Sequence, residues 1–283
     1  MLEAEIVRHA VRAALEEDLG PGDVTSRAVI DPGARAKGTF VARERLIVAG
    51  LPVAKEVFRQ VDPALAFREA CRDGDERAAG ESVAVVEGPA RPILAGERTA
   101  LNFLQRMSGM ATAARRAVAL AGASRVQISD TRKTAPGLRP LDKYAVRAGG
   151  GTSHRAGLFD AVLIKDNHWR LAGGVGEAVR RARRRLQEEG SNLAGIEVEA
   201  GTIEEVSEAL EAGADSILLD NMDRDRLRRA VALARGRAFL EVSGGVREED
   251  IPFLASLGVD RISLGSLTHS VRAADLALEV TPL

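Results

Sequence analysis

Residues 195–220 read GIEVEAGTIEEVSEALEAGADSILLD, which is a short apolar run, a polar and apolar mixture, and a second apolar run. The middle part, IEEVSEALEAGA, has apolar residues at the 3.6-residue spacing of an amphipathic helix. The stretch therefore predicts a strand, a helix and a strand in succession. Strands and helices that alternate at this spacing form parallel strands joined by right-handed crossovers.

The same pattern extends on both sides of this stretch, from about residue 125 onward. The short apolar runs are RVQIS (125–129), DAVLIK (160–165), GIEVE (195–199), DSILLD (215–220), AFLEVS (238–243) and DRISLG (260–265). No Gly-x-Gly-x-x-Gly fingerprint accompanies them, which favours a barrel over a dinucleotide-binding sheet. An open doubly wound sheet is the alternative that the pattern alone leaves open.

The first hundred residues lack this regular alternation. Extended segments are expected in TFVARERLIVAG (39–50) and GESVAVVEGPARPILA (80–95), with a helix at 52–61 between them. A long helix is expected from near Gly96, and Gly122 suits the region of its C-terminal cap. This part of the chain therefore predicts a separate α+β domain.

The chain is thus expected to contain two domains. Residues 1–110 form the first domain, and residues 111–266 form the barrel. The C-terminal segment, 267–283, is expected to join the first domain, although its own sequence does not show this.

The composition of the 283 residues, with 45% apolar and 29% charged residues, is that of an ordinary soluble protein. No run of eighteen apolar residues occurs, so a membrane span is not expected. The N-terminal sequence predicts an amphipathic helix rather than a signal peptide. The single cysteine, Cys71, excludes a disulfide framework and favours a reducing, cytoplasmic setting. A pI near 6.5 gives no support to nucleic-acid binding.

Positive charge gathers between Thr131 and Arg170. This stretch has eight Lys or Arg against three Asp, a local formal charge of +5 in a chain whose net charge is −1. The basic residues are Arg132, Lys133, Arg139, Lys143, Arg147, Arg155, Lys165 and Arg170. Such a cluster repels itself unless an anion completes it. We therefore expect a pocket for a small molecule with several negative charges.

Acidic side chains are expected at the C-terminal ends of the barrel strands, where the working groups of such barrels lie. Glu197 and Glu199 alternate with apolar residues and so face the same way along their strand. Asp220 ends the apolar run SILL. Acids on adjacent strands can hold Mg²⁺ or bind ribose hydroxyls. An ion pair with Lys165 or Arg132 is the alternative role for these acids.

Glycine turns follow the last two strands, in the segments 243–245 (Ser-Gly-Gly) and 264–266 (Leu-Gly-Ser). Glycine lets backbone N–H groups approach a ligand closely, and a helix start adds a favourable dipole. Phosphate sites on barrels are often built from the last two such loops. Both turns are therefore candidate phosphate sites, although glycine can also serve only to close a turn.

A third glycine run, Gly149–Gly151, precedes His154 and Arg155. Arg155 can bind a carboxylate through two parallel hydrogen bonds. A His beside an Arg resists protonation, so His154 is expected to act as a neutral hydrogen-bond donor, or to be purely structural. Arg98 and Asn102 lie one turn apart on the expected long helix, and this spacing alone predicts a capping or surface role.

In their order along the chain, these motifs resemble those of the quinolinate phosphoribosyltransferase family. The matching motifs are Thr131-Arg132-Lys133-Thr134, Gly149-Gly150-Gly151 with His154-Arg155, Leu163-Ile164-Lys165-Asp166-Asn167-His168, Leu218-Leu219-Asp220-Asn221, Ser243-Gly244-Gly245 and Gly265. Two further segments are similar to family signatures, Asp23-Val24-Thr25-Ser26 and Glu97-Arg98-Thr99 with Asn102. The resemblance covers essentially the whole chain, and Val242-Ser243 in place of the more usual Ala-Ser is its one departure.

The resemblance implies an α/β chain with an N-terminal α/β sandwich domain followed by an open TIM-like α/β barrel. It implies a homodimer, or a multiple of dimers, in which Arg98 reaches the neighbouring active site. The implied substrates are quinolinate and phosphoribosyl pyrophosphate, and the products are nicotinate mononucleotide, pyrophosphate and CO₂. Mg²⁺ is the implied cofactor, with no organic cofactor and with no nucleic-acid or membrane partner.

The resemblance also implies roles for individual residues. Those matched to substrate binding are Arg98, Arg132, Lys133, His154, Arg155 and Lys165. Those matched to the 5-phosphate loops are Ser243, Gly244, Gly245, Leu264, Gly265 and Ser266. Glu199 and Asp220 match the acids that face ribose and Mg²⁺, directly or through substrate or water. The implied catalytic residues are Lys133, Lys165, Glu199 and Asp220.

Two other functions stay open at this point. A related pyridine phosphoribosyltransferase could use a different acceptor, but the cations matched to substrate binding favour a doubly charged acid. A phosphate-binding barrel that only senses a metabolite would keep the glycine turns, but it would not need Glu199, Asp220 and Lys165 together. Acyl transfer and ATP hydrolysis are not expected, because the chain has no Ser-His-Asp order and no Walker loop.

Overall fold

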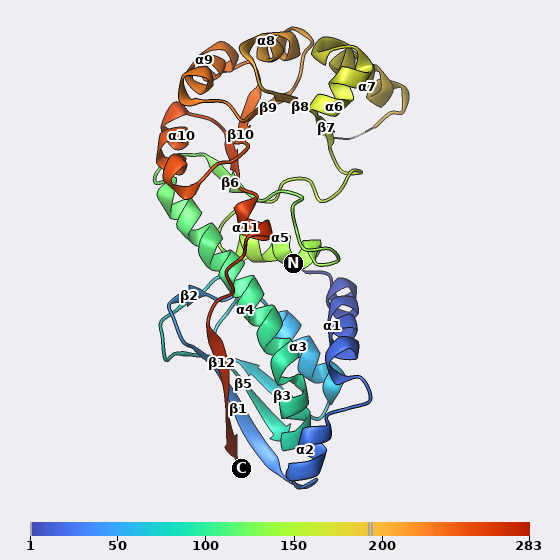
Figure 1. Ribbon diagram of the computed structural model, residues 1–283, viewed down its shortest axis with the longest axis vertical. Coiled ribbons are helices and arrows are strands. Elements are labelled where there is room, and N and C mark those ends of the chain that lie inside the picture. Colours follow the sequence, from blue (N-terminus) through green and yellow to red (C-terminus); the bar gives the residue numbers. More distant parts are fainter. Residues whose placement is uncertain (1, 192, 194) are drawn as a thin grey trace. The chain divides into compact units, whose positions relative to one another are not determined.

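The computed structural model describes residues 2–191, 193 and 195–283 (Figure 1). The chain forms two compact units. The first unit comprises Met1–Arg116, Lys133–Gly151 and Ser266–Leu283, and the second comprises Ala117–Arg132 and Thr152–Gly265. The division expected at residue 110 stays a prediction, and the compact units differ from it mainly at residues 133–151, which belong to the first unit.

The first unit is built on a four-stranded antiparallel sheet of order β12-β1-β5-β3. Its strands are β1 (Arg35–Ala42), β3 (Ala66–Glu69), β5 (Ser82–Pro89) and β12 (Leu276–Pro282). A separate antiparallel pair joins β2 (Leu46–Ile47) to β4 (Glu76–Arg77). Because β12 pairs with β1 from Ala36 to Ala42, the C-terminal strand completes this sheet.

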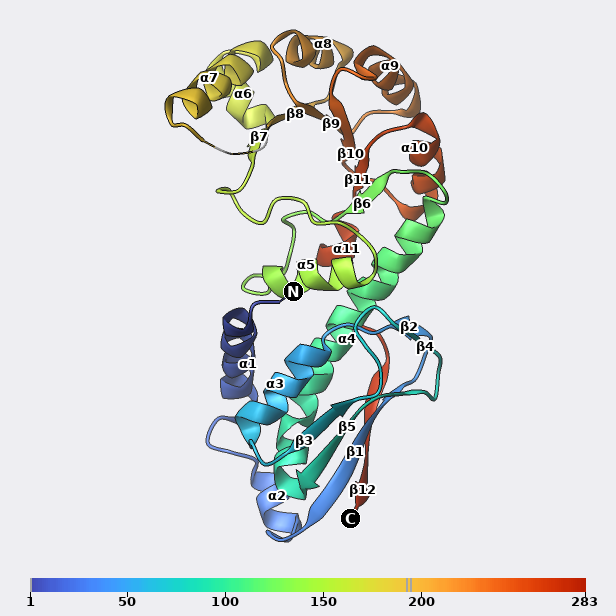
Figure 2. The same cartoon turned by 180° about the vertical axis from the view of Figure 1, so that it is seen from behind.

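Helices run alongside this sheet (Figures 1 and 2). The helices of the first unit are α1 (Ala4–Leu19), α2 (Val24–Val29), α3 (Leu51–Val61), most of α4 (Ala90–Leu120), α5 (Arg139–Ala148) and α11 (Ser266–His269). Phe40 of β1, Phe58 of α3 and Phe67 of β3 pack with ring centroids 5.8 to 6.2 Å apart. A Cβ on Gly96 of α4 would lie 3.0 Å from the Phe58 ring, so the glycine lets these two helices pack closely.

The long helix α4 begins six residues before the expected start near Gly96. Residues 90–95 were expected to be extended, and this prediction is wrong because α4 starts at Ala90, directly after β5. Pro92 falls in the first turn, where a missing N–H group is tolerated. Gly122, which follows the helix, has a φ of 61°, as expected near a C-terminal cap. Although α4 is 31 residues long, neither it nor any other described helix is long and apolar enough to cross a membrane.

The second unit contains the six parallel strands that the sequence predicted. They are β6 (Gln127–Ser129), β7 (Val162–Ile164), β8 (Ile196–Ala200), β9 (Ser216–Asp220), β10 (Phe239–Ser243) and β11 (Arg261–Ser263). Their order is β6-β11-β10-β9-β8-β7, and β6 and β7 do not pair with each other in the described part of the chain, so the barrel is open.

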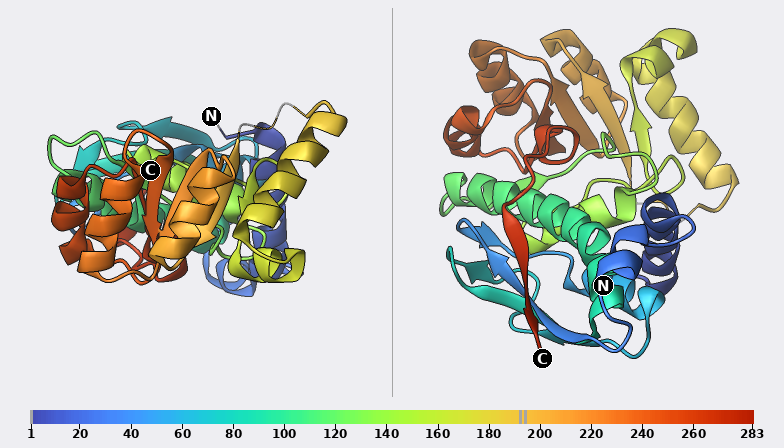
Figure 3. Two further views of the ribbon diagram at one scale, coloured as in Figure 1. Left: turned by 90° about the horizontal axis from the view of Figure 1, so that it is seen from above. Right: turned by 60° about the horizontal axis from the view of Figure 1, so that its bottom comes forward.

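Helices cover the outer side of this curved sheet (Figures 1 and 3). They are α6 (Asp166–Ala172), α7 (Val175–Glu188), α8 (Ile203–Glu211), α9 (Arg224–Ala234), the 3₁₀ turn η1 (Glu248–Asp250) and α10 (Ile251–Leu257). Thr202 and Glu205 form a capping box at the start of α8, and Asp223 caps α9. These caps set the point at which each strand end turns into the next helix.

The six strands have an aliphatic face and a polar face, because successive side chains of a strand point to opposite sides. Alternate positions are buried and aliphatic, namely Ile128, Ile196, Val198, Ile217, Leu219, Leu240, Val242 and Ile262. The positions between them face the inside of the curved sheet and include Glu197, Glu199, Asp220, Glu241 and Arg261. The apolar core of this unit therefore lies between strands and helices, and the inner face carries these charged side chains together with Leu163 and Leu218.

Candidate functional site

Most of the predicted site residues belong to the second unit. They are Arg132, His154, Arg155, Lys165, Glu199, Asp220, Ser243, Gly244, Gly245, Leu264 and Gly265. Because the strands are parallel, residues that follow their C-terminal ends lie along one edge of the sheet. Lys133 directly follows Arg132, and Ser266 directly follows Gly265. Both belong to the first unit, as does Arg98.

Lys165 and Glu199 form an ion pair at the ends of two neighbouring strands. Lys165 follows β7, Glu199 lies on β8, and their Nζ and Oε2 atoms are 2.9 Å apart. The ion-pair role considered for Glu199 is therefore present in the structure, and it uses one of the two carboxylate oxygens. His168 Nδ1 accepts the N–H of Lys165 at 2.8 Å, so His168 caps the start of α6.

Asn221 holds Asp220 next to the first glycine turn. Its Nδ2 donates to Asp220 Oδ2 at 2.6 Å, and its N–H donates to the Ser243 carbonyl at 3.3 Å. Asn221 has a φ of 53°, the one positive value of a non-glycine residue in the described chain. Such a conformation costs free energy and is often kept at functional sites. A Cβ on Gly244 would lie 2.6 Å from Asn221 Oδ1, so this position requires glycine.

The two glycine turns differ in what their backbone offers to a phosphate. Gly244 and Gly245 have φ values of 86° and 61°, a conformation that glycine adopts without strain. The N–H of Leu264, in contrast, donates to the Ser129 carbonyl at 2.9 Å within the sheet. The first turn therefore supports the phosphate prediction better than Leu264 does.

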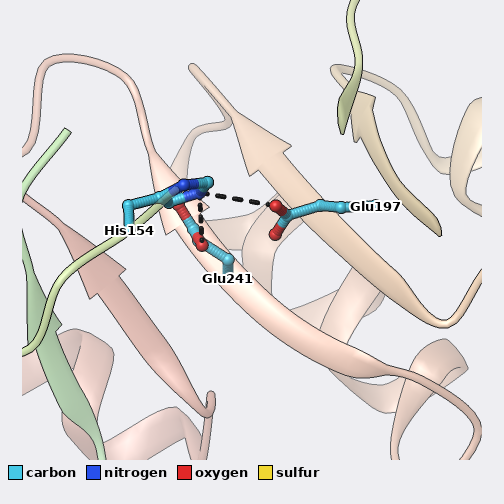
Figure 4. A group of neighbouring side chains, drawn as sticks. All are labelled: His154, Glu197 and Glu241. Atoms are coloured by element: carbon cyan, nitrogen blue, oxygen red, sulfur yellow. Dashed lines mark ion pairs between the residues drawn. The ribbon is translucent and has the colours of Figure 1, made fainter. Parts of the chain in front are cut away.

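His154 lies in a buried group with Glu197, Glu241 and Arg261, which we call the His154 cluster. Its Nε2 atom is 3.4 Å from Glu197 Oε2 and 3.3 Å from Glu241 Oε2 (Figure 4). Arg261 Nη1 lies 3.0 Å from the same Glu241 oxygen. The side chains of His154 and Glu241 are only 9% and 1% exposed. Glu197 therefore has a histidine as its partner, where the sequence suggested Lys, Arg or a metal.

The backbone around His154 is also held in place. Its N–H donates to Asp130 Oδ1 at 2.9 Å, and its Nδ1 accepts the N–H of Arg155 at 2.7 Å. Thr152 forms a parallel bridge with Ser129 of β6. The segment that carries His154 and Arg155 is thus attached to the β6 edge of the sheet.

The neutral state expected for His154 is not what its surroundings favour. Burial lowers the pKa of the imidazole, but the hydrogen bonds and charges of Glu197 and Glu241 outweigh burial and raise the pKa of His154 to about 9. Burial would raise the pKa of Glu241, but His154 and Arg261 lower it. The prediction considered only the neighbouring Arg155, and two carboxylates from distant parts of the chain reverse it.

Arg132 and Arg155, which we call the arginine pair, bring two positive charges together. Burial lowers the pKa of the Arg155 guanidinium, and the charge of Arg132 lowers it further against the opposing effects of Glu197 and Asp160. The buried Nε of Arg132 has no hydrogen-bond partner among the described residues. Two like charges held together in a partly buried place favour an anion that binds both.

Arg98 and Asn102 lie on the exposed side of α4 in the first unit. Thr99 between them is buried and donates to Asp18 at 3.4 Å. Exposure fits both the surface role that the spacing predicts and the role at a neighbouring site that the resemblance implies, so both stay predictions.

Sequence reasoning did not identify Glu241, Arg261 or a role for Asn221. Glu241 interrupts the apolar run AFLEV in the way that Glu197 interrupts GIEVE, so the same alternation argument could have found it. The left-handed conformation of Asn221 leaves no signal in the sequence beyond the general tolerance of Asn for it.

Two family models match this chain. The model described as "Quinolinate phosphoribosyl transferase, C-terminal domain" matches residues 110–279. The model described as "Quinolinate phosphoribosyl transferase, N-terminal domain" matches residues 23–108. The two matches follow each other in sequence and together span most of the chain.

Known proteins are similar to the chain over most of its length. A Bacillus subtilis (strain 168) protein described as "Probable nicotinate-nucleotide pyrophosphorylase (carboxylating)" is 43% identical over 265 residues, which cover 94% of this chain and 90% of that protein. The "Quinolinate phosphoribosyltransferase (decarboxylating) 2, mitochondrial" of Nicotiana glauca is 42% identical over 290 residues, covering 97% and 82%. The solved nicotinate-nucleotide pyrophosphorylase from Francisella tularensis has a TM-score of 0.93 at 39% identity, covering 99% and 98%.

Proposed function

Since the chain belongs to the quinolinate phosphoribosyltransferase family, we propose that it transfers the phosphoribosyl group of phosphoribosyl pyrophosphate to quinolinate. The acceptor loses one carboxylate as CO₂, and the products are nicotinate mononucleotide and pyrophosphate. The reaction is a step of NAD biosynthesis, and we expect it to take place in the cytoplasm.

The arginine pair is the observation that carries the proposal. Quinolinate has two carboxylates on neighbouring carbons of a pyridine ring. Arg132 and Arg155 present two guanidinium groups close enough for the charge of one to change the pKa of the other. Each guanidinium can bind a carboxylate through two parallel hydrogen bonds. We assign quinolinate binding to this pair, with Lys133, His154 and Lys165.

We assign the phosphoribosyl donor to the ends of β9, β10 and β11. The turn at Gly244 and Gly245 supports a 5-phosphate there, because its positive φ values let the backbone approach an anion closely. The residues assigned to the phosphate are Ser243, Gly244, Gly245, Leu264, Gly265 and Ser266. Asp220 and Glu199 lie on neighbouring strands, and their carboxylates suit the ribose hydroxyls.

The same two carboxylates fit a magnesium ion, which prefers oxygen ligands and keeps several waters. Asp220 uses Oδ2 to accept from Asn221, and Glu199 uses Oε2 to accept from Lys165. These bonds occupy one oxygen of each carboxylate, and we assign the second oxygens to the ion, to its waters or to the ribose. When bound, Mg²⁺ supplies positive charge to the departing pyrophosphate.

The chemistry follows from where charge develops. The lone pair of the pyridine nitrogen attacks the anomeric carbon while the bond from that carbon to the pyrophosphate oxygen breaks, so the ring nitrogen becomes cationic. Glu199 and Asp220 stabilise the oxocarbenium character of the sugar, and Lys133 and Lys165 stabilise the anionic groups.

The second step breaks the bond between the ring and the carboxylate beside the nitrogen. CO₂ leaves, the electron pair of that bond stays on the ring carbon, and a proton from water completes the new C–H bond. The cationic nitrogen formed in the first step stabilises this carbanion, and the reaction therefore needs no organic cofactor.

We also propose a homodimer, or a multiple of dimers, in which Arg98 of each subunit contributes to the site of its partner. The exposed position of Arg98 supports this proposal. Chains with Arg98→Ala and chains with Lys133→Ala should each be inactive, and a mixture should regain part of the activity once subunits exchange. A mixture with demonstrated exchange and no activity contradicts a shared site.

The proposed function is tested by mixing the purified protein with quinolinate, phosphoribosyl pyrophosphate and Mg²⁺. We expect CO₂, nicotinate mononucleotide and pyrophosphate to form in equal amounts. Nicotinate, which lacks the second carboxylate, serves as the control acceptor and should react poorly. Turnover of nicotinate without turnover of quinolinate contradicts the proposal.

A further inference from the structure

The His154 ring has a partner on each of its nitrogens. Nε2 faces the carboxylates of Glu197 and Glu241, and Nδ1 accepts the N–H of Arg155. The backbone N–H of His154 donates to Asp130. A direct bond between a ring nitrogen and quinolinate would have to replace one of these partners. The geometry therefore suits a histidine that acts by its charge and by fixing its neighbours.

The charges of the His154 cluster balance only if His154 is a cation. Glu197 and Glu241 carry two negative charges, and Arg261 carries one positive charge 3.0 Å from Glu241. With a neutral imidazole, the cluster itself would keep one net negative charge in a buried place, opposed from outside the cluster by the charge of Arg155, and such a buried charge is costly. That charge would also repel the carboxylates of an anionic substrate. A protonated His154 removes both effects.

We propose that Glu197 and Glu241 are positioning residues of the transfer reaction, which hold the His154 ring as a cation beside Arg155 and so support the binding of quinolinate. This inference rests on the proposed function, because that function places quinolinate at the arginine pair. The two glutamates act through His154 and do not touch the substrate. Arg261, whose guanidinium lies 4.9 Å from the centre of the Phe239 ring, neutralises Glu241.

One contact opposes the cationic state. The bond of 2.7 Å from the Arg155 N–H to Nδ1 suits a neutral ring with its proton on Nε2. Burial also disfavours the cation, yet the carboxylates outweigh burial in raising the pKa of His154 to about 9. A charged hydrogen bond is about twice as strong as a neutral one, and two carboxylates face the ring, so the carboxylates determine its charge. Protonation of Nδ1 then releases the Arg155 N–H for another acceptor, such as a substrate carboxylate.

Charged groups from three strands and two connecting segments enter this balance. They are Glu197 on β8, Glu241 on β10, Arg261 on β11, Asp130 directly after β6, and Arg155 with the neighbouring Arg132. A divalent cation could also use the donor atoms of His154, Glu197 and Glu241, which all lie within 4.8 Å of one another. Because Arg261 already neutralises one glutamate, a single proton suffices to balance the other.

Nitrogen NMR of the histidine rings tests the charge directly. The chain has four histidines, and His154→Gln assigns the signal in protein labelled with ¹⁵N-histidine and kept in EDTA. At neutral pH both ring nitrogens of His154 should be protonated, with titration near pH 9. Glu197→Gln and Glu241→Gln should each lower that pKa by about one unit or more. Glu204→Gln, an exposed glutamate at the start of α8, is the matched control and should leave it unchanged.

Three results of this experiment overturn the proposal. The first is a neutral ring in the wild-type protein at neutral pH. The second is a titration that neither glutamine variant changes. The third is a His154 signal that reaches its shifted position only when Zn²⁺ replaces EDTA, which assigns the cluster to a metal.

Steady-state kinetics add a readout that a merely structural role would not change. In Glu197→Gln and Glu241→Gln, loss of the positive charge on His154 should raise the KM for quinolinate about tenfold. The kcat and the KM for phosphoribosyl pyrophosphate should stay nearly unchanged. Glu241→Asp, which keeps the charge, should restore part of the affinity. A quinolinate KM that stays at the wild-type value while the His154 titration moves contradicts the role in substrate binding.

These experiments distinguish a failure of this inference from a failure of the proposed function and from misfolding of a variant. Glu241 is 1% exposed, so circular dichroism and melting temperature establish whether its variants fold. The Glu197 side chain is 12% exposed, and Glu197→Gln carries the test if Glu241→Gln does not fold. If the wild-type protein does not convert quinolinate, the proposed function fails, while the titration still decides whether the two glutamates hold His154 as a cation.

Discussion

The two faces of the barrel strands have opposite chemistry. Outward side chains such as Ile217 and Leu219 are fully buried between strands and helices. Inward side chains such as Glu197, Glu241 and Asp220 are acids with polar or charged partners. Both sets come from the same short strands, one residue apart. This unit separates stability from chemistry by the alternation of a β-strand, so substitutions on the two faces should have different consequences.

The largest expected effect is on the outer face. Ile217→Ala removes a side chain that is 0% exposed. The lost burial and the remaining cavity should lower the free energy of unfolding by about 2–5 kcal/mol, measured by urea denaturation. The kcat/KM of the folded protein, measured well below its melting temperature, should stay near the wild-type value. A loss of kcat/KM as severe as the loss of stability would contradict the separation of stability and chemistry between the two faces.

On the inner face, Arg155→Ala should change binding rather than stability. Removing one guanidinium of the arginine pair should raise the KM for quinolinate roughly ten- to a hundredfold, or about 1.5–3 kcal/mol. Arg184→Ala, an exposed arginine of α7, is the control and should behave like the wild type. Unchanged quinolinate kinetics in Arg155→Ala would remove this residue from the site.

The outer face could be predicted well from the sequence, and the inner face only in part. The apolar runs placed all six strands, because each run alternates with a helical period that local sequence encodes. Glu199 and Asp220 were expected at strand ends and lie there. The start of α4 at Ala90 was missed, because the apolar segment 90–95 suits a strand as well as a helix.

The partners of the inner-face residues could not be predicted, because they come from distant segments. His154 meets Glu197 and Glu241 only after the sheet has formed, so its local neighbour Arg155 gave the wrong charge state. The same holds for Asn221, whose conformation depends on contacts with Ser243 and the turn that follows. The local sequence pattern determines which face of the sheet a residue occupies, but it does not determine which distant residue becomes its partner.

His154 should make stability depend on pH. Its pKa in the folded protein, about 9, lies above the value of about 6.5 for an exposed histidine. The folded state therefore binds the proton more tightly, and the stabilisation is complete below about pH 6.5 and lost as the pH rises through about 9. Urea denaturation across this window should show a loss of up to about 3 kcal/mol that His154→Gln abolishes. An equal loss in the wild type and the variant would assign the pH dependence to other groups.

Substitutions of Asn221 should give the smallest effect, and they measure how far Asp220 on the inner face depends on its hydrogen bond. Asn221→Ala loses the hydrogen bond to Asp220 and keeps an unfavourable positive φ, whereas Asn221→Gly loses the bond and adopts that φ without strain. Both variants should lower kcat/KM by about two- to tenfold, which corresponds to about 0.5–1.5 kcal/mol. Only the alanine variant should also lower the melting temperature. Full activity in Asn221→Gly would show that Asp220 does not depend on this bond.

We propose that side chains of the inner face carry out the transfer reaction. The most direct test is the rate at which the Asp220→Asn variant releases CO₂ from carboxyl-labelled quinolinate. The substitution keeps the shape of the side chain and removes its charge from the end of β9. CO₂ release should slow by at least about a hundredfold, while the free energy of unfolding stays within about 1 kcal/mol of the wild-type value. Release at the wild-type rate from this variant would contradict the account.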